Sequence, residues 1–431
     1  MEDPLAIMTG TVSGLAFGGS GIVRQEGLVI FIPFTAPGDK ITFKITEKRK
    51  KYAFGELVSV LSPGEDRKEA HCPYFGTCGG CQLQHLEYSA QLTHKREVVE
   101  DSLLRIGRVE MKDLSEVIPS PERWGYRRHI TLTIRPKGAG FEAGYIAIDD
   151  RSLLPVKTCP IFIDEEKNPL LEQLQIFLSK LKSIPENTGR VTILKQEAGS
   201  PLFAFQFEAM PSNASALFEK AFSEYQWGGV HVTAGRETLS WGEKTTSWSV
   251  NEGSFMISPQ AFSQTNHEQS ILLYDKVCEI AQQLKSKRIL DIYSGVGISS
   301  VLLAKQGAKV LGIESNPVAV QLANLNAKNN HTPNATFKQE DAKSAVFTAI
   351  KQFLPDLVVV NPTRNGLDLV VAHALITEMP KQIVYISCMP PTLARDLRLF
   401  RARDYEIKTC EMLDMFPQTA HVETLVHLSR P

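Results

Sequence analysis

Short hydrophobic runs alternate with glycine-containing turns over the first 62 residues of the chain. The runs at 28–33 and 41–45 contain the β-branched and aromatic residues typical of strands, and turn signals stand at 18–21 and 37–39. Short strands at even spacing, separated by such turns, are typical of small closed sheets. We therefore predict a small β-barrel of the oligonucleotide-binding type over residues 1–62.

From residue 287 onward the pattern changes to strand, glycine turn, helix and strand, repeated several times. Two runs, 357–360 and 383–386, are apolar throughout, as in parallel strands that are covered by helices on both faces. This pattern predicts an α/β, doubly wound, Rossmann-like domain, to which we assign residues 251–431.

The stretch between these two parts, residues 63–250, is expected to form a central α+β domain. It begins with the linker-like segment Pro63-Gly64-Glu65-Asp66. Apolar positions from 89 to 105 fit a helix, which could instead pack on the C-terminal domain. Between 163 and 250, helix and strand patterns alternate without a chemical motif, so the sequence says little about that stretch.

The charges of the chain nearly cancel, giving a formal net charge of -1. A protein without a global basic field can bind nucleic acid only through a local site. Two segments, 48–54 and 124–135, combine basic with aromatic side chains and are candidates for nucleic-acid contact. The charge pattern favours a solvated strand edge or turn for the first segment and fits a solvated strand edge at least as well for the second. No apolar stretch has the length that spans a bilayer, and the start is acidic, so we expect a cytoplasmic protein without a membrane partner.

Seven cysteines, unevenly spaced, favour metal or catalytic use over a disulfide framework. Cys72, Cys78 and Cys81 are close enough in sequence to bind one centre, and Cys159, before a proline, is the natural fourth ligand. Four thiolates suit either Zn²⁺ or an iron–sulfur cluster, and three clustered cysteines with a remote fourth favour the cluster. Unligated thiols are the alternative, as we expect for Cys278 and Cys410.

A glycine turn, Asp291-Ile-Tyr-Ser-Gly295-Val-Gly297, follows the first strand of the C-terminal domain, and Glu314 ends the second strand about twenty residues later. Such a turn lets the backbone approach a nucleotide-like ligand, and the acidic residue can bind its ribose. Ser300 replaces the third glycine of the dinucleotide fingerprint. This favours a methyl donor such as S-adenosylmethionine, which has no pyrophosphate, over NAD. Alternatively, the glycines serve only the tight turn.

Two further features support a cofactor site: Asp341 follows a third strand and Asn361 follows a fourth. Cys388 follows the next strand and is succeeded by Met389-Pro390-Pro391, which fixes a turn directly after the thiol. Ligands of open α/β sheets lie beyond the carboxyl ends of the strands. Cys388 is therefore placed like a nucleophile, whereas a buried structural thiol is the alternative.

These motifs together resemble the family of RNA 5-methyluridine methyltransferases that carry an N-terminal TRAM barrel and an iron–sulfur domain. The resemblance extends over essentially the whole chain. The motifs that carry it, in the order of the family, are Cys72-Pro-Tyr-Phe-Gly-Thr-Cys78-Gly-Gly-Cys81-Gln-Leu-Gln-His85, Phe262-Ser-Gln264-Thr-Asn266, Asp291 to Gly297, Ser387-Cys388 to Asp396, and His421-Val-Glu423-Thr424.

The resemblance implies methylation of uracil C5 in RNA, with Cys388 as the nucleophile and Glu423 as the base. It implies a [4Fe-4S] cluster on Cys72, Cys78, Cys81 and Cys159. It implies S-adenosylmethionine contacts by Gln264, Tyr293, Gly295, Glu314, Asp341 and Asn361. Among RNA substrates, 23S rRNA is favoured over tRNA, because the cluster and the added barrel accompany ribosomal members more often. A monomer is expected.

Three places depart from the family pattern. The segment Asn361-Pro-Thr363-Arg364 stands where the family commonly has Asp-Pro-Pro-Arg. Met389 stands where Asn is usual, and Ser294 stands where many relatives have Cys. An amino-group methyltransferase is one alternative, since Asn361-Pro362 resembles the start of its motif, but that motif needs an aromatic residue where Arg364 stands. The other alternative is a non-catalytic RNA-binding or ribosome-assembly protein that has lost turnover.

Overall fold

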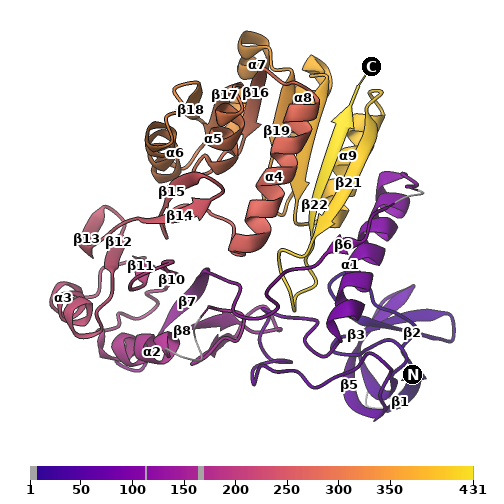
Figure 1. Cartoon of the computed structure of the whole chain (residues 1–431). Helices are drawn as coiled ribbons and strands as arrows, with labels where there is room; N and C mark the ends of the chain where they lie inside the picture. Colours follow the sequence, from indigo (N-terminus) through magenta and orange to yellow (C-terminus); the bar gives the residue numbers. More distant parts are fainter. Residues whose placement is uncertain (1–6, 112–113, 164–168, 431) are drawn as a thin grey trace.

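A computed structural model describes residues 7–111, 114–163 and 169–430 of the chain. The C-terminal α/β part occupies the top of the view in Figure 1, with a central sheet and a small barrel side by side below it. The first described residues lie at the barrel, and the last described residues lie in the C-terminal part. In the described ranges, no helix has the length and apolar character needed to cross a membrane.

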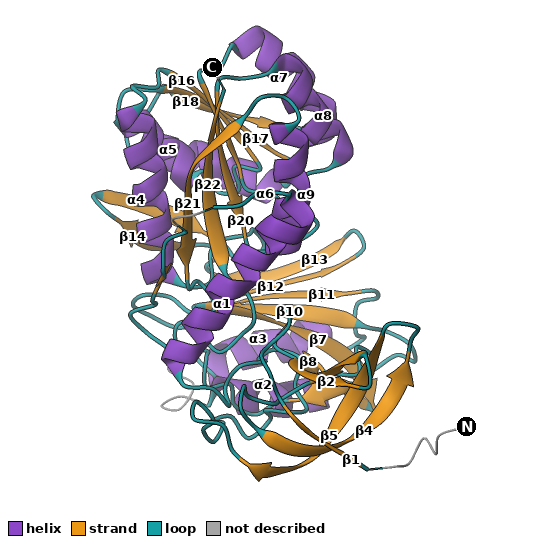
Figure 2. Ribbon diagram, turned by 90° about the vertical axis from the view of Figure 1, so that its right-hand side faces the viewer, coloured by secondary structure: helices purple, strands orange, loops and turns teal. Residues whose placement is uncertain are grey.

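The N-terminal strands form one five-stranded sheet in the order β1-β4-β5-β3-β2. Alternate residues of β4, including Ile41 and Phe43, are buried, and their neighbours are more exposed. The edge strands β1 and β2 contact each other, so the sheet curls on itself and the predicted small barrel is confirmed (Figure 2). The strands are β1 (Met8–Thr11), β2 (Gly21–Gln25), β3 (Leu28–Ile32), β4 (Lys40–Lys48) and β5 (Tyr52–Ser62).

The central part is built on a seven-stranded sheet in the order β13-β12-β11-β10-β7-β8-β9. Phe203, Phe205 and Phe207 of β11 are buried on one face, where Phe205 contacts Phe177 of α2 and Phe218 of α3. The two helices therefore cover this face. The elements are β7 (His129–Lys137), β8 (Gly140–Ile146), β9 (Leu153–Pro155), α2 (Leu170–Lys180), β10 (Gly189–Leu194), β11 (Leu202–Phe207), α3 (Ala214–Glu224), β12 (Gly229–Ala234) and β13 (Glu237–Gly242).

The C-terminal part has an eight-stranded sheet in the order β18-β17-β16-β19-β20-β22-β21-β6. Strands β16 to β20 pair in parallel, and β22 runs antiparallel to β20. All four residues of β19 are buried, as predicted for a strand covered on both faces. The strands are β16 (Arg288–Ile292), β17 (Lys309–Glu314), β18 (Ala335–Gln339), β19 (Leu357–Val360), β20 (Gln382–Ser387), β21 (Glu406–Leu413) and β22 (Glu423–Ser429).

Helices cover both faces of this sheet, and two separate apolar cores result. Asn316 caps the N-terminus of α6 by accepting from the backbone of Val318 and Ala319, as its position before Pro317 predicts. The short hairpin of β14 (Thr246–Val250) and β15 (Gly253–Ile257) packs on α6. The helices are α4 (His267–Gln283), α5 (Ile298–Lys305), α6 (Pro317–Asn329), α7 (Ala342–Phe353), α8 (Leu369–Glu378) and α9 (Pro390–Arg401).

One segment from the first half of the chain is built into the C-terminal part. Helix α1 (Tyr88–Ser102) and the π-helical turn η1 (Leu103–Gly107) pack on α9, and the short strand β6 (Val117–Ile118) pairs with β21. Lys95 of α1 is fully buried, and its Nζ lies 2.5 Å from Oδ1 of Asp414. This pair holds α1 against the loop that joins β21 to β22.

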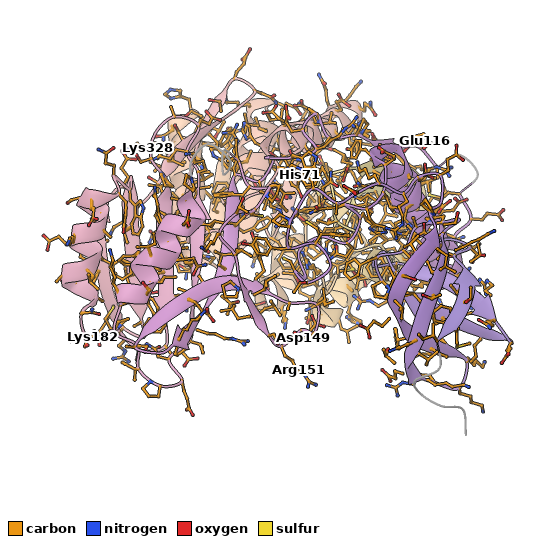
Figure 3. The ribbon with its side chains drawn as sticks, turned by 90° about the horizontal axis from the view of Figure 1, so that it is seen from below. His71, Glu116, Asp149, Arg151, Lys182 and Lys328 are labelled. Carbon is orange, nitrogen blue, oxygen red and sulfur yellow. The ribbon has the colours of Figure 1, made fainter. Side chains whose placement is uncertain are left out.

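The cysteine-rich segment after β5 lies between the barrel and the rest of the protein. Figure 3, seen from below, shows His71 at its start, with the barrel on one side and Lys182, just after α2, on the other. Within the mixed aromatic and basic stretch 124–135, the Tyr126 side chain is buried and Arg127 lines the cavity of the cysteines, so these two residues are not part of an exposed nucleic-acid surface. The stretch continues into β7, where His129 and Thr131 line a separate groove.

Candidate active site

Cys388 and Glu423 meet at the carboxyl end of β20. Cys388 directly follows β20, and Glu423 is the first residue of β22. The antiparallel register pairs Ser387 with Thr424. One step beyond this pair, Cys388 and Glu423 lie opposite each other, although they are far apart in the sequence.

Glu423 is buried, Cys388 is half-buried, and the charge of Glu423 acts on the thiol. Burial raises the pKa of Glu423 to about 8. Burial also raises the pKa of Cys388, to about 11, and the charge of Glu423 contributes to this increase. A carboxyl group whose pKa lies near neutral pH can both accept and release a proton there, which is the property of a general base.

Arg364 and His421 also reach Cys388, and the sequence interpretation assigned a function to neither. Arg364 hydrogen-bonds the Cys388 side chain, and its charge lowers the pKa of the thiol. The His421 ring hydrogen-bonds the Cys388 backbone, and burial and the charge of Arg364 lower its pKa to about 4. His421 and Glu423 are two residues apart, the spacing that places side chains on one face of an extended chain, and this signal could have revealed His421.

The turn after Cys388 is fixed by hydroxyl groups on both sides of it. The Met389 backbone N–H donates to Ser387 Oγ at 3.2 Å. Thr392 Oγ1 lies 3.1 Å from the Met389 carbonyl and 3.2 Å from the Arg364 carbonyl, so it joins the turn to the Arg364 loop. Met389 is the N-cap residue of α9, but its side chain makes no capping hydrogen bond. The loss of Asn at this position therefore removes a potential cap, whereas the turn itself is kept.

Four of the residues predicted to bind the methyl donor line one pocket beside this turn. They are Gln264, Tyr293, Gly295 and Asn361. Ile386, two residues before Cys388, lines the same pocket. The backbone of Gly295 has a φ of 55°, a left-handed conformation that glycine adopts without strain, so the loop can curve around a ligand. The pocket therefore lies at the end of the strand that presents Cys388.

Glu314 and Asp341 do not line this pocket, and each has a structural partner. The carboxylate of Glu314 accepts from the backbone N–H of Gly295 at 3.1 Å and of Asn316 at 2.8 Å. Asp341 caps α7, where it accepts from the Lys343 backbone at 2.9 Å. Asp341 lines a neighbouring cavity of about 430 Å³. Tyr293 lines both cavities, so a long ligand could extend from one into the other.

Ser300, at the position of the missing third glycine, is buried and has a defined partner. Its hydroxyl donates to Asp291 Oδ2 at 2.6 Å. Burial raises the pKa of Asp291 to about 7, the Ser300 hydrogen bond opposes this increase, and the charge of Glu314 adds to it. The departure from the dinucleotide fingerprint thus has a structural reason, because Ser300 stabilises an acidic residue at the floor of the pocket.

The four cysteines of the predicted cluster, Cys72, Cys78, Cys81 and Cys159, line one cavity. Within the described ranges, no group of three or more His, Cys, Asp or Glu side chains is arranged to hold a single metal ion. The structure therefore bears out neither of the two metal predictions, zinc or an iron–sulfur cluster, at these four thiols.

Arg127 contributes a positive charge to the cysteine cavity. Its charge lowers the pKa of Cys78, Cys81 and Cys159, although burial, the larger effect, raises each of them and brings Cys81 to about 12. The buried Nε of Arg127 has no hydrogen-bond partner among the described residues. A cation and an unpaired donor beside four thiols fit an anionic thiolate-bound group.

Two family models match this chain. Residues 236–431 match the family described as tRNA (Uracil-5-)-methyltransferase. Residues 8–64 match the TRAM domain of tRNA (uracil(54)-C(5))-methyltransferase. The structure is similar to that of Pyrococcus abyssi tRNA (uracil-54, C5)-methyltransferase in complex with S-adenosyl-L-homocysteine, with a TM-score of 0.74, 28% identity, and coverage of 98% of this chain and 100% of that one.

Curated relatives also match over nearly their whole length. An RNA methyltransferase of Protochlamydia amoebophila is 44% identical, over 98% of this chain and 97% of the relative. One of Halalkalibacterium halodurans is 30% identical, over 97% and 96%. The matched family favours carbon methylation over the amino-group alternative. On these matches, the chain belongs to the family of S-adenosylmethionine-dependent RNA (uracil-C5) methyltransferases.

Proposed function

We propose that this protein methylates C5 of a uridine in RNA, with Cys388 as the nucleophile and Glu423 as the base. The observation that carries the proposal is the register of β20 and β22, which sets Cys388 opposite Glu423. Ile386 and Asn361 line the adjacent pocket, so a methyl donor bound there would lie beside the thiol.

Uracil C5 is a poor nucleophile, and Cys388 provides the means to activate it. Its thiolate adds to C6, and the electrons of the C5–C6 double bond move toward the carbonyl, which makes C5 nucleophilic. S-adenosylmethionine, when bound in the adjacent pocket, would supply the methyl group for C5 and leave as S-adenosylhomocysteine. Glu423 then removes the proton from C5, the bond between C6 and the Cys388 sulfur breaks, and the double bond and the thiolate are restored.

Arg364 and the buried surroundings have defined tasks in this sequence. Arg364 stabilises the thiolate of Cys388 by hydrogen bond and charge. Because the reacting face of a stacked base is covered, the uridine must leave its stack before Cys388 can reach C6. The cost of unstacking is offset by contacts elsewhere on the RNA.

The barrel offers one such contact surface. Tyr52 and Phe54 are 40% and 41% exposed, and both rings pack against Phe31. The basic segment 48–51 lies directly before them in the sequence. Exposed aromatic rings beside cationic side chains suit stacking of unpaired bases and contact with phosphates.

The mechanism is tested by Cys388→Ser, with Cys278→Ser, a buried thiol on α4, as the control. We expect Cys388→Ser to lose transfer of labelled methyl groups to RNA, while Cys278→Ser keeps it. Glu423→Gln should accumulate a covalent complex with RNA, visible by denaturing electrophoresis, since the adduct forms but C5 keeps its proton. An unchanged rate in Cys388→Ser would exclude the mechanism and leave the non-catalytic alternative ahead.

We also propose that Cys72, Cys78, Cys81 and Cys159 hold a [4Fe-4S] cluster. The shared cavity and the cationic Arg127 beside it support this assignment. With all four thiols used as ligands, a function in folding or RNA recognition is favoured over redox catalysis. Anaerobic purification followed by iron, sulfide and zinc analysis tests the proposal. The proposal would be contradicted by stoichiometric zinc without iron, or by an iron content in Cys81→Ser equal to that of the unchanged protein.

For the RNA substrate, we propose 23S rRNA, on the resemblance to cluster-containing members with an added barrel. A tRNA substrate is the second candidate, because the matched family and the similar Pyrococcus abyssi structure are both described as tRNA methyltransferases. Mapping of 5-methyluridine in 23S rRNA and tRNA from cells with and without the protein separates the two. Location in the cytoplasm and a monomeric state remain predictions from the sequence.

A further inference from the structure

The face of the central sheet that α2 and α3 leave open is lined by polar side chains. The register aligns Thr131, Thr192 and His231 in one row across β7, β10 and β12, with Ala204 of β11 between the last two. A second row aligns Arg190, Gln206 and Thr233. Their neighbours in sequence, such as Val191 and Phe205, point to the core on the other face. Polar residues at every second position therefore form a continuous surface.

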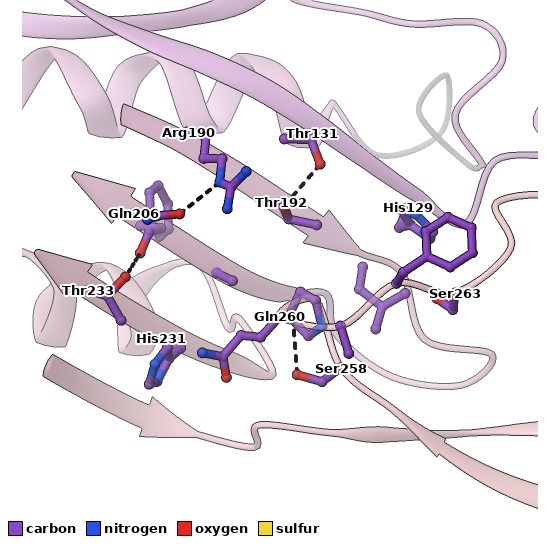
Figure 4. Close-up of a pocket in the computed structure, with 16 residues that line it drawn as sticks. His129, Thr131, Arg190, Thr192, Gln206, His231, Thr233, Ser258, Gln260 and Ser263 are labelled. Atoms are coloured by element: carbon purple, nitrogen blue, oxygen red, sulfur yellow. Dashed lines mark hydrogen bonds between the residues drawn. The ribbon is translucent and has the colours of Figure 1, made fainter. Parts of the chain in front are cut away.

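This surface is the floor of a groove of about 440 Å³ (Figure 4). The segment 258–263, which leads from β15 to α4, forms its wall. The volume lies within the range of about 300–1,000 Å³ that is typical of ligand sites. Among the described residues, no carboxylate lines the groove, whereas Arg190 and two histidines, His129 and His231, do. Its charge therefore complements an anionic ligand.

The groups in the groove are suited to different parts of such a ligand. Arg190 is exposed, donates to Gln206 Oε1 at 2.8 Å, and has no carboxylate partner within the described ranges, so its remaining donors can bind a phosphate. The Nδ1 atoms of His129 and His231 are buried without a partner among the described residues. Burial lowers the pKa of both rings, that of His129 to about 4, so they are neutral and can exchange hydrogen bonds with the edge of a base.

The groove and the pocket proposed for the methyl donor share a wall. Phe262 and Ser263 line both cavities. If an RNA strand places one base at Cys388, the nucleotides next to that base can therefore reach the groove. Sequence-specific recognition of RNA usually targets unpaired bases in this way, by hydrogen bonds to their edges.

We propose that this groove binds an unpaired nucleotide of the substrate RNA adjacent to the methylated uridine, with its phosphate on Arg190 and its base edge among Gln206, His129 and His231. The inference rests on the proposed function and adds a specificity site to it. The groove then selects the uridines to be methylated by their sequence neighbours, in addition to the recognition of uracil at Cys388.

The test uses the full-length protein and the variants Arg190→Gln and His231→Ala. The control is Lys220→Gln, which removes a positive charge from exposed α3 on the opposite face of the sheet. Binding is measured with poly(U) RNA as the probe, over a range of salt concentrations, so that no mapped methylation site is needed. Methyl transfer to a transcript of 23S rRNA gives kcat and KM.

For Arg190→Gln we expect roughly tenfold weaker binding of poly(U), in line with the loss of one charge-assisted contact. The slope of log affinity against log salt should fall by about 0.7, as expected when one phosphate contact to a single strand is lost. His231→Ala should raise KM for the transcript with a much smaller effect on the salt slope. Lys220→Gln should change neither quantity. A structural defect alone would not alter the salt slope.

Several results would overturn the inference. If Arg190→Gln has the same affinity for poly(U) and the same salt slope as Lys220→Gln, the phosphate contact is excluded. If the groove variants raise only the KM for S-adenosylmethionine, the groove belongs to the methyl donor. If Arg190→Gln does not fold, His231→Ala decides the question: an unchanged KM for the transcript would exclude the groove as an RNA-binding site. Such results leave the proposed function intact as long as Cys388→Ser loses methyl transfer, because Cys388→Ser tests the chemistry and the groove variants test RNA binding.

Discussion

Replacement of Glu423 by Gln should abolish turnover and, at alkaline pH, stabilise the protein. Glu423 is 2% exposed, and burial raises its pKa from 4.5 to about 8. In the unfolded chain the carboxyl group loses its proton near pH 4.5, but in the folded protein it does so only near pH 8. Between these values the unfolded chain binds fewer protons, so the stability of the folded state falls as the pH rises, and above pH 8 the full cost is present.

The size of this cost follows from the pKa. The increase of the Glu423 pKa from 4.5 to about 8 corresponds to about 5 kcal/mol of unfolding free energy, because each pKa unit is worth about 1.4 kcal/mol. Gln has nearly the same shape and no charge, so the Glu423→Gln variant avoids this cost. For a domain of the size of the C-terminal part, about 5 kcal/mol corresponds to a Tm difference of roughly 10 °C or more.

The assay is thermal unfolding of both proteins at pH 5 and pH 9, followed by circular dichroism. We expect similar Tm values at pH 5 and a clearly higher Tm of Glu423→Gln at pH 9. Glu406→Gln, at an exposed position of β21, is the control and should change little at either pH. Because the charge of Glu423 raises the pKa of Cys388, Glu423→Gln should also speed alkylation of this thiol. Equal Tm values at pH 9 would refute a buried acid with a raised pKa.

Three further predictions follow from the contacts around the site. Arg364→Gln removes the charge that lowers the pKa of Cys388, so iodoacetamide should alkylate the thiol several-fold more slowly at neutral pH, and Arg364→Lys should retain part of the rate. Lys95→Met leaves Asp414 buried without its cation and should destabilise the protein by about 3–5 kcal/mol in urea unfolding, whereas removing both charges should cost less. Met389→Asn supplies a cap for α9 and should stabilise it by at most about 1 kcal/mol, since the prolines after it offer no N–H; a loss of stability would contradict this.

The parts of the site that lie at strand ends could be predicted from the sequence. Runs such as 357–360 and 383–386 identify parallel strands, and the carboxyl ends of such strands share one edge of the sheet. Asn361 and Cys388 each stand directly after a strand, and Gly295 lies in the turn that follows another, so their convergence follows from the pattern alone. The family resemblance then supplied the functions of these residues, which a strand pattern cannot provide.

Other parts could not be predicted, because they depend on contacts between distant segments. Strand β6 has only two residues, and no periodicity can be read from so short a run. The groove on the central sheet arises from side chains on β7, β10, β11 and β12, and each of these strands alone shows an ordinary alternation of polar and apolar residues. Only the register between them brings Arg190 beside Gln206.

The buried acid at the centre of the site explains why a segment from the first half of the chain is needed there. A carboxyl group with the pKa of Glu423 costs stability whenever it is ionised, so its position must be enforced by the surrounding structure. Asp414 lies in the loop that leads from β21 to Glu423, and it accepts hydrogen bonds from both Lys95 and Tyr88 of α1. A displaced α1 would leave Asp414 buried without partners, which keeps this loop in one conformation. Helix α1 therefore belongs functionally to the C-terminal part, and the loss of the Lys95 contact should impair the geometry at Cys388 before it unfolds the sheet.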